Sequence, residues 1–346
     1  MIVLSRVSKL SSMISLADLL LHINFVIFRI KKTKIHLFAY IRISQNEVYS
    51  EGNNIVLVYI IVLEVKSMKK LKVFSLVLLF ALFFIGVKDV DAASSVKVHF
   101  LNVGQGDAIL VQTPNENILI DGGGKGKGPD VINYLKKNKV TSLTAVVSTH
   151  PDADHVGGLA HVIKNMKVGK VYAPNVSHTT QAYKDFLTAV KNKKLKITTV
   201  KQGLEIPTKA KDITLKFLGP VKTYAKSDLN NWSAVLHLKH NKKTFLFTGD
   251  AETKSENDLL AKKLITKVDV LKVAHHGSKY STSAKFLDKV KPTYSVISVG
   301  KNGYSHPTSD VLNRLKKVKS TVYRTDKSGN VIFTSNGSKI TVKTVK

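Results

Sequence analysis

The segment that most constrains this chain covers residues 149–158 and has the sequence THPDADHVGG. Two imidazoles and two carboxylates fall within six residues there, directly after the apolar run 143–148. Side chains of this kind, packed together, repel one another or stay unpaired unless a cation lies among them. Two glycines follow and let the backbone turn closely into the next helix. The segment therefore predicts a metal site at the end of a buried strand, and hence a metal-dependent hydrolase.

A helix N-cap is the competing interpretation, with Asp152 or Asp154 accepting backbone N–H groups beside incidental surface histidines. It explains one aspartate but not the other three side chains. The first histidine and aspartate project to the same side if the chain is extended there, and the later pair can diverge towards a second position. The predicted metal ligands of this segment are His150, Asp152, Asp154 and His155.

Two later motifs also follow apolar strands and supply further candidate ligands. Residues 247–250 have the sequence FTGD, where Asp250 could bridge two metal ions or, alternatively, cap a helix that begins near Glu252. Residues 273–278 have the sequence VAHHGS. We predict that one of His275 and His276 binds metal while the other orients substrate or a ligand. Paired surface histidines are the alternative for that motif.

Three shorter motifs have both a functional and an ordinary interpretation. Residues 104–107 (GQGD) join two strands, and a tight glycine hairpin alone would explain them. Residues 121–124 (DGGG) end a third strand and are equally compatible with a flexible loop. In residues 304–307 (YSHP), His306 is either an ordinary loop residue or a group that binds phosphate or protonates a leaving group.

Composition restricts the chemistry and the partners. The chain contains no cysteine, which excludes thiolate zinc sites, disulfides and cysteine nucleophiles, so histidine and carboxylate must hold any metal. The formal net charge is +30 over 346 residues, and most of the cations are lysines. Such a charge indicates a polyanionic partner or surface. A lysine-rich solubilising surface is the alternative, because the lysines are spread along the chain rather than clustered.

The N-terminal third contains a pattern typical of export. Residues 68–92 begin with a basic segment that contains Lys69, Lys70 and Lys72, followed by an uncharged apolar core over 73–87 and a small-residue cleavage site. This layout predicts a secretory signal peptide or, alternatively, an uncleaved anchor. We interpret residues 1–67 as an extension outside the fold that arises from a misassigned start site; a membrane-associated extension is the alternative. Without the 12 cationic and 6 acidic residues of 1–92, residues 93–346 keep a net charge of +24.

From residue 96 onward, apolar periodicity predicts alternating strands and helices. Strands are expected over 96–103, 108–113, 117–121, 143–148, 213–218, 234–238, 244–248, 268–274, 294–299, 321–324, 330–334 and 339–345, and helices over 129–137, 159–165, 181–191, 252–264 and 309–317. Strands that first form meanders and later alternate with helices suggest two mixed sheets with helices outside. We expect one α/β domain over residues 93–346.

The order of these motifs resembles the metallo-β-lactamase superfamily. More narrowly, six motifs between residues 101 and 307 are similar to the C-terminal hydrolase domain of ComEC-type competence proteins and their stand-alone secreted relatives. These motifs are LNVGQGDAILV, LIDGGG, STHPDADHVGG, FTGDAE, VLKVAHHGS and YSHP. The resemblance implies an αββα sandwich with a metal centre at one edge between the sheets. Asp152 stands where the wider superfamily most often has a second histidine, and a further usual histidine has no clear counterpart near residues 230–233.

The resemblance also implies an activity. The expected reaction is hydrolysis of a phosphodiester by a metal-activated water, with one or two Zn²⁺ or Mn²⁺ ions, because the carboxylate-rich ligand set makes manganese a rival to zinc. Asp154 and His306 are the expected proton-transfer groups, and Asp107, Asn231 and Ser278 are expected to contact substrate. DNA is the first expected substrate. The alternatives are an envelope phosphodiester polymer of the teichoic-acid or phosphocholine type, and a polyanion-binding module that has lost catalysis.

Overall fold

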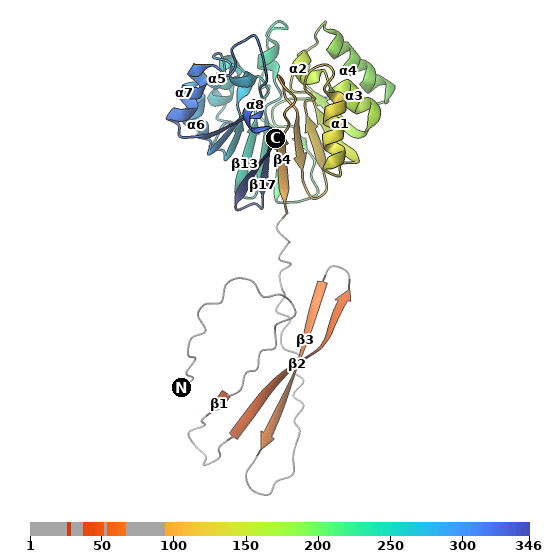
Figure 1. Ribbon diagram of the computed structural model, residues 1–346, viewed down its shortest axis with the longest axis vertical. Helices are drawn as coiled ribbons and strands as arrows, with labels where there is room; N and C mark the ends of the chain where they lie inside the picture. The colour runs from red at the N-terminus through yellow and green to blue at the C-terminus, as the bar shows by residue number, and fades with distance from the viewer. Residues whose placement is uncertain (1–25, 29–36, 52–53, 67–93) are drawn as a thin grey trace. The chain divides into compact units, whose positions relative to one another are not determined.

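A computed structural model describes residues 26–28, 37–51, 54–66 and 94–346, which belong to two compact units, Met1–Val90 and Asp91–Lys346. In the first unit, β1 (Val26–Phe28), β2 (Leu37–Glu51) and β3 (Asn54–Lys66) form an antiparallel sheet in that order (Figure 1). Sequence periodicity predicts no strand in this extension, because residues 55–63 are almost continuously apolar rather than alternating. The predicted signal peptide, residues 68–92, lies outside the described residues and stays a prediction.

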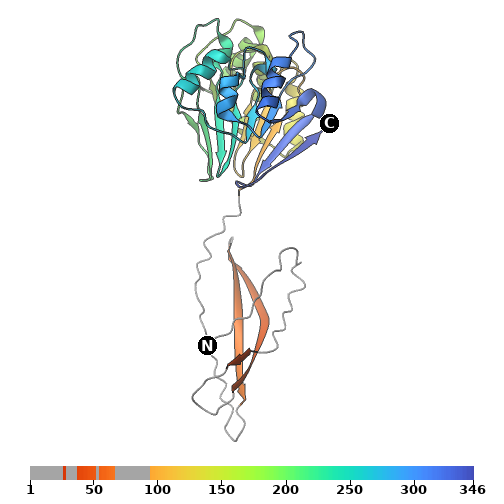
Figure 2. The same ribbon diagram turned by 90° about the vertical axis from the view of Figure 1, so that its left-hand side faces the viewer.

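Two mixed sheets pack face to face in the second unit (Figures 1 and 2). The eight-stranded sheet has the order β18-β17-β4-β5-β6-β7-β8-β9. Its strands are β4 (Val96–Phe100), β5 (Ile109–Gln112), β6 (Asn117–Ile120), β7 (Ser142–Val147), β8 (Lys167–Ala173), β9 (Ile197–Thr199), β17 (Asn330–Ser335) and β18 (Ile340–Val345). Pairing is antiparallel from β18 to β6 and parallel from β6 to β9.

The seven-stranded sheet has the order β10-β11-β12-β13-β14-β15-β16. It comprises β10 (Glu205–Ile206), β11 (Ile213–Phe217), β12 (Leu236–His240), β13 (Lys243–Phe247), β14 (Val270–Lys272), β15 (Tyr294–Ile297) and β16 (Thr321–Arg324). Pairing is again antiparallel in the first part and parallel from β13 to β16. Each sheet therefore contains parallel strands whose carboxyl ends can build a site.

Helices cover the outer face of each sheet, which gives the αββα arrangement that the sequence predicts (Figure 1). The helices are α1 (Gly128–Lys137), α2 (Ala153–Val156), α3 (Leu159–Asn165), α4 (Gln181–Asn192), α5 (Thr253–Ala261), α6 (Ala284–Val290), α7 (Ser309–Lys317) and α8 (Thr325–Ser328), with 3-10 turns η1 (Leu229–Trp232) and η2 (Ala274–Gly277). Side chains such as Phe100, Phe247 and Phe333 fill the space between the sheets. No helix in the described part of the chain is long and apolar enough to cross a membrane.

The predicted strands and helices agree with the structure in type and in most bounds, and the fold class is confirmed. Sequence reasoning missed β8 and α6, and also the shorter elements β9, β10 and α8. Strand β8 begins KVGK, with only one apolar residue in its first four positions, and α6 is only seven residues long. Helix α2 was missed because its four residues contain two of the expected ligands. Such short elements depend on tertiary contacts more than on periodicity.

Candidate metal centre

The predicted ligands leave the carboxyl ends of parallel strands in both sheets. His150 follows β7, and α2 then places Asp154 and His155. Asp250 follows β13, and η2 follows β14 with the histidine pair. Because the two sheets face each other, these segments meet at one edge of the sandwich, which is where sites form in sheets with parallel strands. The structure thus brings together side chains from strand ends that are distant in the sequence, as the predicted metal site requires.

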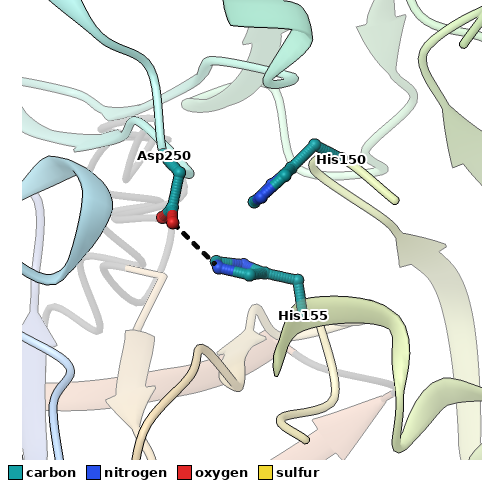
Figure 3. Close-up of side chains that lie close together, drawn as sticks. All are labelled: His150, His155 and Asp250. Carbon is teal, nitrogen blue, oxygen red and sulfur yellow. Dashed lines mark ion pairs between the residues drawn. The ribbon is translucent and has the colours of Figure 1, made fainter. Parts of the chain in front are cut away.

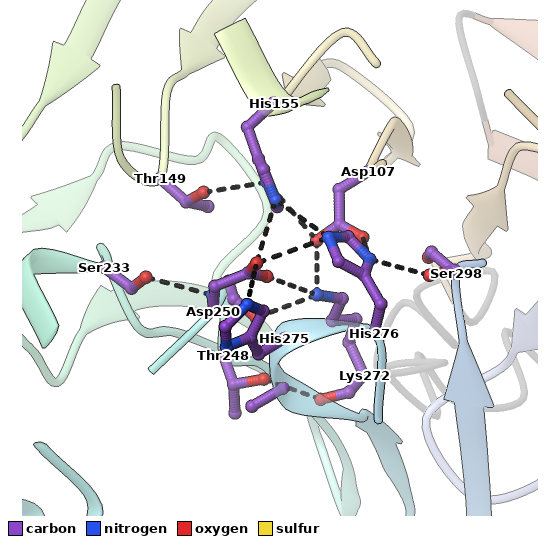
Figure 4. A network of polar contacts seen from close by, with 12 residues as sticks. Asp107, Thr149, His155, Ser233, Thr248, Asp250, Lys272, His275, His276 and Ser298 are labelled. Carbon is purple, nitrogen blue, oxygen red and sulfur yellow. Dashed lines mark hydrogen bonds and ion pairs between the residues drawn. The ribbon is translucent and has the colours of Figure 1, made fainter. Parts of the chain in front are cut away.

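Four ligand atoms converge at the centre of this edge (Figures 3 and 4). The Nε2 atoms of His155 and His276 lie 3.2 Å apart. Asp250 Oδ2 lies 3.2 Å from the first of these nitrogens and 3.3 Å from the second. Asp154 Oδ2 lies 3.1 Å from His276 Nε2. The ring of His150 packs beside His155 with 4.1 Å between centroids. These residues form two groups able to hold a metal ion: His150, His155 and Asp250, and Asp154, His155 and His276.

Hydrogen bonds on the far side of each imidazole fix which nitrogen faces the centre. The Nδ1 atom of His155 lies 2.8 Å from Asp121 Oδ2, and His276 Nδ1 lies 2.8 Å from the carbonyl oxygen of Ser298. A carboxylate and a carbonyl only accept, so each Nδ1 donates its proton. In the neutral rings both Nε2 atoms then direct lone pairs inward, the arrangement that histidine ligands of metals adopt.

The charges around these imidazoles favour a cation between them. Burial by itself would lower the pKa of His276, but Asp250 and Asp154 outweigh it and raise that pKa to about 9. The same balance of burial against Asp250, Asp154 and Asp121 raises the pKa of His155. Burial would raise the pKa of Asp154, yet His155 and His276 lower it. Positive charge is therefore strongly stabilised at this point, whether as protons or as a metal ion.

The donor set fits a divalent cation on three structural observations. Two inward lone pairs and two carboxylate oxygens crowd within hydrogen-bond distance, which is unfavourable without positive charge among them. The fully buried His150 Nε2 makes no hydrogen bond of regular geometry among the described residues, and only an Asp152 carboxylate oxygen at 3.4 Å forms an ion-pair contact with it there. All donors are imidazole nitrogens and carboxylate oxygens, which suit zinc and manganese alike. The donor atoms in the structure are therefore of the two kinds, histidine and carboxylate, that the sequence predicts as metal ligands.

A buried lysine lies beneath this cluster (Figure 4). Lys272, at the end of β14, is 0% exposed. Its Nζ lies 2.5 Å from Asp107 Oδ2 and 3.3 Å from Asp250 Oδ1, and it donates to the carbonyl oxygen of Gly249 at 2.8 Å. Burial would lower the pKa of Lys272, but Asp107 and Asp250 raise it. The ammonium thus binds one oxygen of Asp250 and leaves the other for the centre.

The two histidines of η2 point to different places. His276 is 1% exposed and faces the centre, whereas the His275 side chain is 23% exposed and its Nε2 lies 3.9 Å from Asp250 Oδ2. Its Nδ1 lies 3.3 Å from Glu252 Oε1. Both histidines have left-handed backbone angles, with φ of 49° and 51°, a strained conformation that is frequent at functional sites. The sequence left open which histidine is the ligand, and this geometry favours His276.

Asp152 lies at the rim of the site. One of its carboxylate oxygens is 3.4 Å from His150 Nε2 and the other is 3.8 Å from His178 Nε2. Burial would raise the pKa of Asp152, but His150 and His155 lower it. His178, in the loop before α4, was not anticipated, because a lone histidine in a loop gives no signal in the sequence.

The structure also places the predicted proton donor and substrate contacts. The ring of His306 packs against His275 with 5.4 Å between centroids, and its Nδ1 is buried without a partner among the described residues. Asn231 and Ser278 are almost fully buried, and Asn231 binds protein groups, including the backbone N–H of Ser255 at 2.9 Å. Asp107 is buried against Lys272. Substrate contact for the last three residues stays a prediction, and their burial favours a positioning role.

Asp121 was missed as a site residue, because a flexible loop explained the DGGG sequence equally well. In the structure it is fully buried and accepts from the Thr149 backbone N–H at 2.8 Å and from the Thr149 hydroxyl at 2.6 Å, in addition to His155. Lys272 was missed as well. A lysine at the end of the apolar strand sequence VLK was the available signal, since an unpaired buried lysine is rare.

Comparisons with known proteins agree with this geometry. The metallo-beta-lactamase superfamily model matches residues 101–301. ComE operon protein 3 of Bacillus subtilis (strain 168) is 32% identical over 262 residues, covering 70% of this chain and 33% of that protein. Recombination protein 2 of Haemophilus influenzae is 32% identical over 241 residues, covering 68% and 28%. The chain thus spans about a third of the length of these curated relatives.

Among solved structures, the metallo-beta-lactamase fold protein YhfI from Bacillus subtilis superimposes with a TM-score of 0.48 at 12% identity, over 70% of this chain and 100% of that one.

Proposed function

Because the chain belongs to the metallo-β-lactamase superfamily, we propose that it is an exported, metal-dependent phosphodiesterase that hydrolyses DNA. The fold and the histidine and aspartate groups support a metal-dependent hydrolase, and the finer assignment of reaction and substrate is ours. The observation that carries the proposal is the convergence of His155 Nε2, His276 Nε2 and Asp250 Oδ2 within 3.3 Å of one another.

In this proposal His150, His155, His276, Asp154 and Asp250 hold one or two Zn²⁺ or Mn²⁺ ions. Such an ion supplies, when bound, an acidified water and neutralisation of phosphate charge. Asp154 keeps its negative charge because the neighbouring imidazoles lower its pKa, so it suits a ligand better than a proton store. Burial and the charges of His275 and His276 lower the pKa of His306, so this ring is neutral near pH 7 and can accept a proton or a hydrogen bond.

Charge favours an anionic polymer as substrate. Residues 93–346 have a net charge of +24, which attracts polyanions and makes their binding sensitive to salt. Two relatives are named Recombination protein 2 and Competence protein ComA, and the latter, from Neisseria gonorrhoeae, is 32% identical over 237 residues. These names favour DNA as the polymer. Export rests on the signal-peptide pattern of residues 68–92.

An envelope phosphodiester polymer is the second candidate substrate, favoured by the same export pattern. Polyanion binding without catalysis is the third candidate. The experiment compares wild type, Asp154→Ala and His155→Ala, each loaded with Zn²⁺ or Mn²⁺, on DNA, bis-p-nitrophenyl phosphate and wall polymer. His161→Ala is the matched control, since this histidine is exposed on α3.

We expect DNA cleavage by wild type and the control, and loss of more than about 100-fold in both site variants. Turnover of wall polymer and the small diester without DNA cleavage would replace DNA by the envelope polymer. DNA binding without turnover of any substrate would refute catalysis.

A further inference from the structure

A row of aromatic rings leads from the buried centre to the surface. Neighbouring centroids along it lie 4.1, 5.1, 6.2, 5.4 and 5.6 Å apart. The row consists, in order, of His150, His155, His276, His275, His306 and Tyr304. The proposed metal ligands occupy its inner end. Its outer end is therefore the rim of the same site.

The ring at the outer end belongs to the most exposed large hydrophobic side chain of the described residues. Tyr304 is 74% exposed, and its ring lies beside that of His306, with 5.6 Å between the centroids and a tilt of 30° between the planes. Tyr280 follows at 61%, on the loop after η2. A scattered exposed aromatic residue needs no explanation, but an exposed ring backed by a second ring beside a catalytic centre offers a flat apolar surface to a ligand.

The loop that presents Tyr304 is held in place by one side chain. Asn302 Oδ1 accepts from the backbone N–H groups of Tyr304 and His306, both at 3.0 Å. Asn302 Nδ2 donates to the carbonyl oxygens of Gly300 and His306 at 2.8 and 2.9 Å. Because these bonds fix the backbone, a ligand that stacks on the tyrosine orders little beyond its side chain, which reduces the entropic penalty of binding.

The same loop is joined to the metal-binding turn. Thr308 donates to the carbonyl oxygen of Gly277 through its backbone N–H at 2.9 Å and its hydroxyl at 3.1 Å. A Cβ on Gly277 would lie 2.5 Å from Pro307 Cβ, so only glycine permits this approach next to His276. The position of the exposed ring is thus coupled to the position of a proposed ligand.

We propose that Tyr304, backed by His306, is a stacking platform for an unpaired base beside the phosphodiester, so that the substrate is single-stranded nucleic acid. Stacking on an aromatic ring contributes about 1–3 kcal/mol per base and tolerates any sequence. A paired base within a duplex does not offer its face, and a glycerol- or ribitol-based polymer has no ring of this kind. This inference rests on the proposed function and names the substrate class of that site.

The test measures binding as well as turnover. Fluorescence anisotropy at fixed salt compares a labelled thymidine hexanucleotide with an abasic phosphodiester of the same length and charge, for wild type, Tyr304→Leu and Tyr304→Trp. Tyr280→Leu is the matched control, because this exposed tyrosine lies on a neighbouring loop, outside the row of rings. Thermal unfolding of each variant checks that the fold is kept.

We expect Tyr304→Leu to weaken hexanucleotide binding by about 5- to 150-fold and to leave the abasic polymer unchanged, whereas Tyr304→Trp and Tyr280→Leu keep the preference for bases. Equal wild-type affinity for both polymers, an equal loss for both in Tyr304→Leu, or the same loss in Tyr280→Leu would overturn the platform. A base preference that depends on Tyr304 without cleavage by metal-loaded protein would refute the proposed nuclease and keep the platform. Cleavage of the hexanucleotide and the abasic polymer at equal rates would refute the platform and keep the proposed phosphodiesterase.

Discussion

Replacing the buried Lys272 by methionine tests how the charges under the metal centre are balanced. Methionine keeps an unbranched side chain that is one heavy atom shorter, and it removes the ammonium. Asp107 is 1% exposed, and Lys272 is its nearest cation, at 2.5 Å, while its other charged neighbours, His155 and His276, lie 3.7 Å away. Removing one partner of a buried pair leaves an uncompensated charge, which destabilises a protein by about 3–5 kcal/mol.

The assay is urea unfolding of the Lys272→Met variant, and of a double variant that also has Asp107→Leu. For a domain of this size, 3–5 kcal/mol corresponds to a fall in Tm of roughly 6–20 °C. The double variant should recover much of the loss, because the unpaired carboxylate is gone and burying apolar side chains in place of an ion pair is often neutral.

Metal affinity is a second measurement on the same variants, because without Lys272 the Oδ1 atom of Asp250 loses the ammonium that binds it. We expect weaker metal binding in both variants by about 10- to 100-fold, the usual effect of losing a group that orients a ligand. A Lys272→Met variant that unfolds within 1 kcal/mol of wild type would refute the reasoning. So would a double variant that is less stable than the Lys272→Met variant.

Two further predictions concern the metal centre, and a third concerns His99, a buried histidine of β4 whose Nδ1 lies 2.9 Å from the Tyr134 hydroxyl. His276→Ala should abolish metal retention in equilibrium dialysis, whereas His275→Ala should reduce it by less than about tenfold, and equal loss would contradict the assignment of His276 as the ligand. Adding Zn²⁺ or Mn²⁺ at about 100 times its Kd should raise the free energy of unfolding by about 2.7 kcal/mol, and chelation should reverse the rise in calorimetry. Burial and Lys97 lower the pKa of His99 to about 4. Stability from this neutral histidine is therefore complete above pH 6.5 and is lost as the pH falls towards 4, by up to about 3 kcal/mol. His99→Gln should flatten that part of the stability profile measured by urea unfolding, and an unchanged profile would refute the role of His99.

Much of the fold was accessible from periodicity, because helices such as α3 and α7 have clear apolar faces. The candidate metal centre was accessible from the motif at residues 149–158, and the absence of cysteine left only imidazole and carboxylate as ligands. Motif order then predicted the αββα sandwich, which the two sheets and their helices confirm. Periodicity did not predict the seven-residue helix α6 or strand β8, because both depend on neighbours distant in the sequence.

The sequence by itself determined the kind of ligand, the strand ends that present them and the excess of positive charge. Only the tertiary structure decided which members of each motif face the centre. Left-handed backbone angles at His275 and His276 break the alternation that a strand pattern assumes, so spacing cannot tell which ring turns inward. The same holds for Lys272 and Tyr304. One is buried and the other exposed because of what packs against them from other strands and loops, and those neighbours exist only once the chain has folded.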